Sequence, residues 1–154
     1  MRTHSILNIR TALIASALAV ALVSPTLHGQ NASARSQMDV PFAFQVGSTH
    51  FAAGTYILSG PQEHILDVQG PTRSALTMSW YETSLTPAPA SKVIFDRYGN
   101  QYFLREVWIK GKVDHLLCPE SKAEHEARLP QKPYDRASLP TRTHVEIALL
   151  QGPR

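Results

Sequence analysis

Apolar and polar residues alternate with a period of two along most of the chain after residue 38. This alternation is typical of β-strands that turn one face toward a core. In the run 73–81, for example, Leu76, Met78 and Trp80 share one face. Glycine or proline, which favour turns, separates most of the runs. The runs predicted to form strands are 40–46, 55–59, 64–68, 73–81, 94–109 on both sides of a turn, 112–117 and 144–149.

The run 94–109 predicts a β-hairpin closed by Gly99-Asn100, a two-residue turn whose first position needs a positive φ that glycine adopts without strain. This register makes Asp96 and Arg105 diagonal neighbours, which predicts an ion pair between them. Phe95 and Val107 are expected on different faces of the hairpin. Both faces mix charged with apolar residues, which favours a curved barrel wall or a sheet covered in part by a helix. The facing pairs expected are Arg97 with Tyr102, Phe95 with Leu104, and Val93 with Glu106.

Residues 120–129 predict one short helix that ends before Pro130. Ser121 and Glu124 have the spacing of a capping box, in which each side chain bonds the other's backbone N–H. Opposite charges four residues apart add support to an isolated helix. The pairs of this kind are Lys122 with Glu126 and Glu124 with Arg128.

These elements predict a single, mainly β domain over residues 38–150, with an irregular crossing over 130–143. Many short strands separated by turns are typical of a small antiparallel β-barrel or β-sandwich, here of about six to eight strands with one short helix near the C-terminus. The strand after the crossing is expected to pair with the free edge of 40–46, because unpaired edges invite aggregation.

The first residues have the pattern of a secretory signal peptide. Arg2 and Arg10 precede an apolar stretch over 11–23, which is too short to span a bilayer and is followed by Pro25. We expect cleavage after residue 29, with cleavage after residue 34 as the alternative. The mature chain would then be exported to the periplasm or the cell exterior without a membrane anchor.

The charge of the chain argues against nucleic acid as a partner. Removing residues 1–29 takes away two arginines, so 15 basic residues become 13 against 12 acidic ones. Nucleic-acid binding requires a clustered basic face, and the sequence contains none.

Cys118 is the single cysteine and cannot form a disulfide within the chain, so it is expected to be buried or tolerated, with intermolecular pairing or reactivity as the alternatives.

Motifs for enzymatic chemistry are missing from the sequence, and no catalytic residue is assigned. Nucleophile elbows, phosphate-binding glycine loops and His-Glu-x-x-His motifs do not occur. The acids available for a carboxylate pair are interpreted as surface charges, because their spacing singles out no pair. These acids are Asp67, Glu82, Asp96 and Glu106.

Metal binding is not expected either, and no cofactor is implied. His115-x-x-Cys118 is the best ligand spacing, with His125 and Glu120 as further donors. Structural zinc sites usually have two close pairs of ligands, whereas only one pair is present.

Four stretches occur in the order VPFAFQVG (40–47), FAAGTY (51–56), FDRYGNQYFL (95–104) and PESKAEHE (119–126). Together they resemble a family of short exported bacterial proteins of uncharacterised function. Its members have a signal peptide, a VPFxFxVG strand, an LPAGxY turn, an RYG[DN]xYFL hairpin and an LPxSKxExE helix start. Ala52 replaces the usual proline of the turn and Cys118 a usual leucine, which argues against a catalytic thiol. The resemblance implies a shared fold and export, and it implies no activity, cofactor or partner.

The leading functional hypothesis is a non-enzymatic exported domain with a binding or structural role, whose partner is unknown and would be a protein or an apolar ligand. The first alternative is a small periplasmic hydrolase that uses dispersed acids and histidines, such as Asp96, Glu106 and His115. The second alternative is a barrel with an apolar or aromatic ligand in its interior. The side chains expected to line that interior are Tyr56, Trp80, Phe95, Tyr102 and Trp108.

Overall fold

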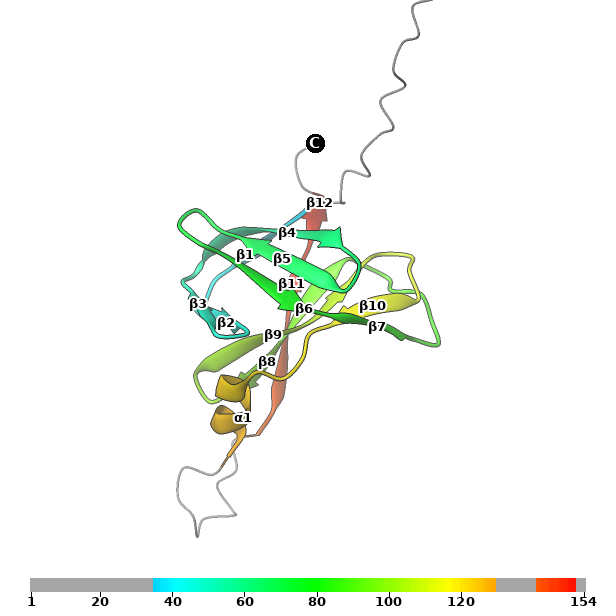
Figure 1. Ribbon diagram of the computed structural model, residues 1–154. Helices are drawn as coiled ribbons and strands as arrows, with labels where there is room; N and C mark the ends of the chain where they lie inside the picture. The colour runs from blue at the N-terminus through cyan, green and yellow to red at the C-terminus, as the bar shows by residue number, and fades with distance from the viewer. Residues whose placement is uncertain (1–34, 130–140, 152–154) are drawn as a thin grey trace, which may run out of the picture. The chain divides into compact units, whose positions relative to one another are not determined.

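The computed structural model describes residues 35–129 and 141–151, which belong to one compact unit. These residues are mainly β structure in two sheets, with one short helix toward the C-terminus, α1 (Lys122–Arg128) (Figure 1). The mainly β fold with a single short helix is therefore confirmed. The signal peptide, both expected cleavage sites and residues 130–140 of the crossing lie outside the described residues.

Neighbouring strands are antiparallel in both sheets, with the exception of one parallel pair. The five-stranded sheet has the order β12 (Leu150–Gln151), β1 (Ser36–Val40), β4 (Gly54–Gln62), β5 (Ile65–Gln69) and β6 (Ser74–Met78). The main path of the seven-stranded sheet is β11 (Thr143–Ala148), β8 (Lys92–Tyr98), β9 (Gln101–Trp108), β10 (Asp114–Leu117) and β7 (Trp80–Thr83). Two further strands, β2 (Phe44–Val46) and β3 (Thr49–Phe51), pair with each other, and β2 also pairs in parallel with β9. The sheets do not close into a barrel, so the sandwich alternative describes the fold.

The described residues contain twelve strands, more than the expected six to eight, because some predicted runs are divided and very short strands are added. The run 40–46 shows the division: β1 ends at Val40 in one sheet, and β2 begins at Phe44 in the other. Pro41 lies at the break, where it cannot donate a ladder hydrogen bond. The prediction of one strand over 40–46 was therefore wrong.

The strand after the crossing is β11, and it pairs with β8 rather than with residues 40–46. The chain then continues into β12, which pairs with Ser36 and Gln37 of β1. The late segment thus covers an edge of each sheet. Its register places His144 directly opposite Asp96.

Aromatic side chains from both sheets fill the core. Phe44, at the centre, stacks on Phe51 and meets the edges of Tyr56 and Phe95, with ring centroids 5.0–5.2 Å apart. The Tyr56 hydroxyl donates to the Ala52 carbonyl at 2.7 Å, so this buried polar group is satisfied. Most of the remaining core residues are aliphatic, among them Leu58, Val68, Val93 and Leu104, and Met38 and Cys118 also belong to the core.

The β8–β9 hairpin has the predicted register near its turn but not at its far end. Arg97 faces Tyr102 and Phe95 faces Leu104, as expected, and a β-bulge then shifts the pairing. Beyond the bulge Val93 faces Val107 instead of Glu106, so that prediction was wrong. An extra residue moves the following side chains to the other face. Val107 accordingly lies in the core with Phe95, which explains why both faces looked mixed in the sequence.

The apolar face of β6 and β7 points away from the core. Leu76, Met78 and Trp80 are exposed, whereas Ala75 and Ser79 on the alternate face are buried. Ser79 alone separates β6 from β7, so the chain passes from one sheet to the other at this residue. Corners of this kind are common where strands switch sheets.

Candidate functional site

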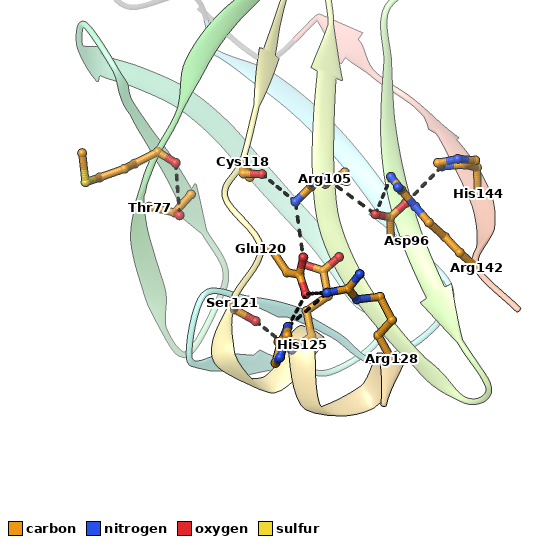
Figure 2. A network of polar contacts seen from close by, with 12 residues as sticks. Thr77, Asp96, Arg105, Cys118, Glu120, Ser121, His125, Arg128, Arg142 and His144 are labelled. Atoms are coloured by element: carbon orange, nitrogen blue, oxygen red, sulfur yellow. Dashed lines mark hydrogen bonds and ion pairs between the residues drawn. The ribbon is translucent and has the colours of Figure 1, made fainter. Parts of the chain in front are cut away.

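A group of charged side chains gathers on the face of β8 and β9 that turns away from the aromatic core (Figure 2). We call Asp96, Arg105, Glu124, Arg142 and His144 the Asp96 cluster. The Asp96 carboxylate is completely buried. Its Oδ2 lies 2.8 Å from Nη2 of Arg142, and its Oδ1 lies 3.0 Å from Nδ1 of His144. The cluster therefore contains a buried charge with two half-exposed cationic or titratable partners.

Arg105 connects this carboxylate to the helix. It is at the bulge of β9, and bulges often redirect a side chain. Its Nε lies 3.7 Å from Oδ2 of Asp96, which confirms the expected diagonal pair, and its Nη1 lies 4.0 Å from Oε2 of Glu124. Nη1 also donates to the Cys118 carbonyl at 3.1 Å, and the Cys118 N–H returns a bond to the Arg105 carbonyl. One guanidinium thus holds β8, the segment before α1, and α1 itself.

Glu124 is turned into the protein rather than back along its helix. Ser121 Oγ accepts from the Glu124 N–H at 3.1 Å, so one half of the predicted capping box is present. The Glu124 carboxyl is buried beside Arg105. Burial raises the pKa of Glu124 to about 7, with further upward contributions from Asp96 and Glu120, against the lowering effect of Arg105.

The outer side of α1 carries surface ion pairs that differ in part from those predicted. Lys122 lies 3.8 Å from Glu126, as expected. Arg128 contacts Glu120 at 3.2 Å instead of Glu124, because the Glu124 side chain is directed inward. Exposed pairs of this kind contribute little to stability.

A second polar row crosses the same sheet farther from the helix. Lys92, Trp108, His115 and Glu82 lie opposite one another on β8, β9, β10 and β7. The rings of Trp108 and His115 stack with centroids 3.8 Å apart, and His115 Nε2 lies 3.7 Å from Glu82. Lys92 Nζ is 5.9 Å from the Trp108 ring. Each member therefore packs against its neighbours, which is the usual role of cross-strand pairs.

The suggested metal-ligand set does not come together. His115 stacks on Trp108, whereas Cys118 belongs to the hydrophobic core on the other face. His125 contacts Glu120 at 3.1 Å on the outside of α1. Within residues 35–129 and 141–151, no three histidine, cysteine or acidic side chains converge as metal ligands. Burial raises the pKa of the Cys118 thiol to about 12, which keeps it protonated and poorly nucleophilic.

The four candidate acids are also separate. Asp96 belongs to the cluster above, Glu106 accepts from the Trp108 indole at 2.7 Å, and Glu82 contacts His115. Asp67, on β5 of the other sheet, accepts from Gln69. Asp96 and Asp67 are buried rather than surface charges, so the interpretation of all four as surface charges was wrong for these two.

The aromatic residues expected to line one interior lie in different places. Tyr56 and Phe95 are close-packed in the core, and Tyr102 packs against its margin. Trp108 lies on the opposite face of the seven-stranded sheet, and Trp80 is exposed. Their positions do not form a common lining.

The chemical capacity of the Asp96 cluster is best judged from His144. A buried aspartate 3.0 Å from Nδ1 of a half-exposed histidine resembles the pair that orients a general base, but here the two groups form an ion pair without hydrogen-bond geometry. The sequence alone does not place His144, Arg142 and Glu124 beside Asp96, because only the β11–β8 pairing and the position of the helix bring them there. In the described part of the chain no hydroxyl or thiol hydrogen-bonds to His144, and two arginines share the same carboxylate. The arrangement therefore fits an ion cluster that fixes β11 and α1 to β8 and β9.

Comparison of the chain with protein-family models, curated proteins and solved structures gives no significant match. The resemblance to short exported proteins thus stays a prediction. No helix in residues 35–129 or 141–151 has the length and hydropathy to cross a membrane.

Proposed function

We propose that this chain is an exported, non-enzymatic β-sandwich domain of the periplasm or cell exterior that acts by binding a protein surface. The observation that carries the proposal is the apolar stripe, which we define as Leu76, Met78 and Trp80. These side chains are 69%, 68% and 43% exposed, although other large residues of the same alternating pattern are buried. Contiguous exposed apolar residues commonly mark interaction sites.

The buried and half-buried charged side chains contact one another, which indicates a structural role for them and leaves binding to the apolar stripe. Asp96 is in contact with Arg142, His144 and Arg105, and Glu106 is bonded to Trp108. These contacts hold the strands and the helix together. The stripe has no charged residue, and its apolar side chains are open to solvent. Burial of such area against a partner is favourable by roughly 25 cal/mol per Å² before the costs of association.

Export can be tested by following the complete chain in a bacterial host with a periplasm. We expect a periplasmic product whose mass corresponds to loss of residues 1–29, or of 1–34 for the alternative site. A variant with Leu13→Arg and Leu18→Arg interrupts the apolar stretch and should stay in the cytoplasm at full mass. Full-length wild-type protein in the cytoplasm would contradict the export proposal.

The role of the stripe can be tested by comparing what the mature chain captures from an envelope extract of its own cells. The Leu76→Ser, Met78→Ser variant should lose capture of at least one protein by about tenfold or more, because interface energy is concentrated in a few apolar anchors. Leu85→Ser is the matched control, since Leu85 is fully exposed outside the stripe. Equal capture by both variants would refute the proposal. Both variants should keep wild-type unfolding curves, because surface changes usually alter stability by about 0.5 kcal/mol or less.

A further inference from the structure

Strand β6 has one hydrogen-bonding edge without a partner strand in the described residues. It is the last strand of the five-stranded sheet and pairs there with β5 alone. The Ser79 N–H donates to the His64 carbonyl at 2.8 Å, which fixes the alternation of the antiparallel ladder. Residues 75, 77 and 79 therefore direct their backbone groups to β5, and Ser74, Leu76 and Met78 direct theirs outward.

The outward backbone N–H and C=O groups of Leu76 and Met78 form almost no hydrogen bonds within the described residues. Among the described residues, the Met78 carbonyl accepts a long, 3.3 Å hydrogen bond from the Thr77 hydroxyl (Figure 2). No other hydrogen bond forms to the outward backbone groups of Leu76 or Met78 within these residues. Both side chains are also largely exposed.

Strand β6 lacks the protective features of the edge strands β12, β11 and β7. Proteins normally blunt edge strands with charge, proline, bulges or very short length. Here β12 has two residues, β11 carries His144 and Glu146, and β7 carries Glu82. The β6 sequence Ser-Ala-Leu-Thr-Met contains no charge and no proline, and its pairing with β5 is regular. This edge is therefore suited to accept another strand.

We propose that the occupant of this edge is β6 of a second copy of the same chain, in antiparallel pairing centred on Leu76. This inference rests on the proposed contact role of the stripe and names its partner. In this register Leu76 faces Leu76 of the second copy, and Ser74 of each copy faces Met78 of the other. Every outward N–H then meets an outward carbonyl. Registers centred farther along β6 engage fewer of these groups, because Trp80 directs its backbone to β10.

Charge and side chains are compatible with the same register. The two-fold arrangement keeps each residue on its own face, so the apolar side chains of both copies form one continuous row. No charged residue belongs to the paired segment, and like charges are not placed opposite each other. Arg73 comes just before the strand and is occupied, since its Nη1 donates to the His50 carbonyl at 2.9 Å.

The size of the contact predicts a weak dimer rather than an obligate one. Two five-residue strands bury less than the roughly 1,200 Å² of the smallest stable interfaces. The association should therefore appear as concentration-dependent self-association of the mature chain in sedimentation experiments. A wild-type chain that stays monomeric over a hundredfold concentration range would overturn the inference.

A pair of variants at one position separates strand pairing from simple apolar contact. Leu76→Pro removes the outward N–H while the bonds of Ala75 and Thr77 to β5 stay available, and proline is tolerated at such edge positions. By symmetry two hydrogen bonds of the dimer are lost, so self-association should weaken about tenfold or more. Leu76→Ala keeps the N–H and should weaken it less, and Leu85→Ala should have no effect. Equal loss in the proline and alanine variants would overturn the inference but leave the stripe as a contact surface.

Amide hydrogen exchange provides a measurement that does not depend on the folding of the proline variant. In the wild-type chain the Leu76 and Met78 amides should become more protected as protein concentration rises, while the Tyr81 amide on β7 should not change. Protection of Leu76 and Met78 that is independent of concentration would contradict pairing between copies. If capture by the Leu76→Ser, Met78→Ser variant is also normal, the proposed function fails together with this inference.

Discussion

Replacement of Arg105 by leucine is expected to lower the free energy of unfolding by about 3 kcal/mol, the lower end for breaking a buried ion pair, because Asp96 keeps Arg142 and His144 while Glu124 loses its only cation in the described residues. Asp96 is completely buried, and Glu124 is nearly so. Arg105 is the cation between them, at 3.7 Å and 4.0 Å, and it also bonds the Cys118 carbonyl. Leucine fills similar space but supplies neither charge nor hydrogen bonds. Urea unfolding with linear extrapolation measures the change.

Arg97→Leu is the matched control for this prediction. Arg97 is also on the β8–β9 hairpin, where it bonds the Gly99 carbonyl and lies 5.4 Å from the Tyr102 ring. An exposed contact of this type contributes about 1 kcal/mol or less. A loss in Arg105→Leu no larger than in Arg97→Leu would contradict the bridging role of Arg105.

Neutral acids should compensate in part for the missing arginine. Adding Asp96→Asn and Glu124→Gln to Arg105→Leu makes neutral the two carboxyl groups that Arg105 contacts. The three changes together should therefore cost less than the sum of their separate effects, which is the signature of coupled residues. Additive losses would show that the three side chains act independently.

The local parts of the fold could be predicted from the sequence because they depend on neighbouring residues. Gly99 has a positive φ at the hairpin turn, and the register next to it is the one expected. The bulge that brings Arg105 into place was not visible, because no residue type in 104–106 requires it. From that point the predicted faces were exchanged, and Val107 proved to be a core residue.

The Asp96 cluster depends on contacts between segments far apart in the sequence. Asp96 and Arg105 could be paired through the hairpin, whereas His144 needs the β11–β8 register and Glu124 needs the docked helix. The alternation in 73–81 shows the same limit. It correctly gathered Leu76, Met78 and Trp80 on one face, but only the packing of the sheets shows that this face is exposed.

The buried position of Glu124 makes folding stability depend on pH. Its pKa is 4.5 in an ordinary environment and about 7 in the folded protein. Below pH 4.5 the carboxyl is protonated in both states, so the contribution of its raised pKa to stability is fully present. Between pH 4.5 and 7 the unfolded chain releases the proton while the folded chain retains it, and stability falls as pH rises.

Glu124→Gln should remove this loss of stability, because glutamine stays neutral at every pH. Relative to wild type, the variant should gain little near pH 4 and up to about 3 kcal/mol above pH 7, as follows from the size of the pKa change. The exposed Glu126, paired with Lys122 on the outer side of the helix, provides the control Glu126→Gln, whose difference from wild type should change far less with pH. A Glu124→Gln difference that stays constant from pH 4 to pH 8 would contradict a protonated, buried Glu124. Because Arg105 lowers the pKa of Glu124, Arg105→Leu should move the wild-type loss of stability to higher pH, which ties this titration to the same cluster.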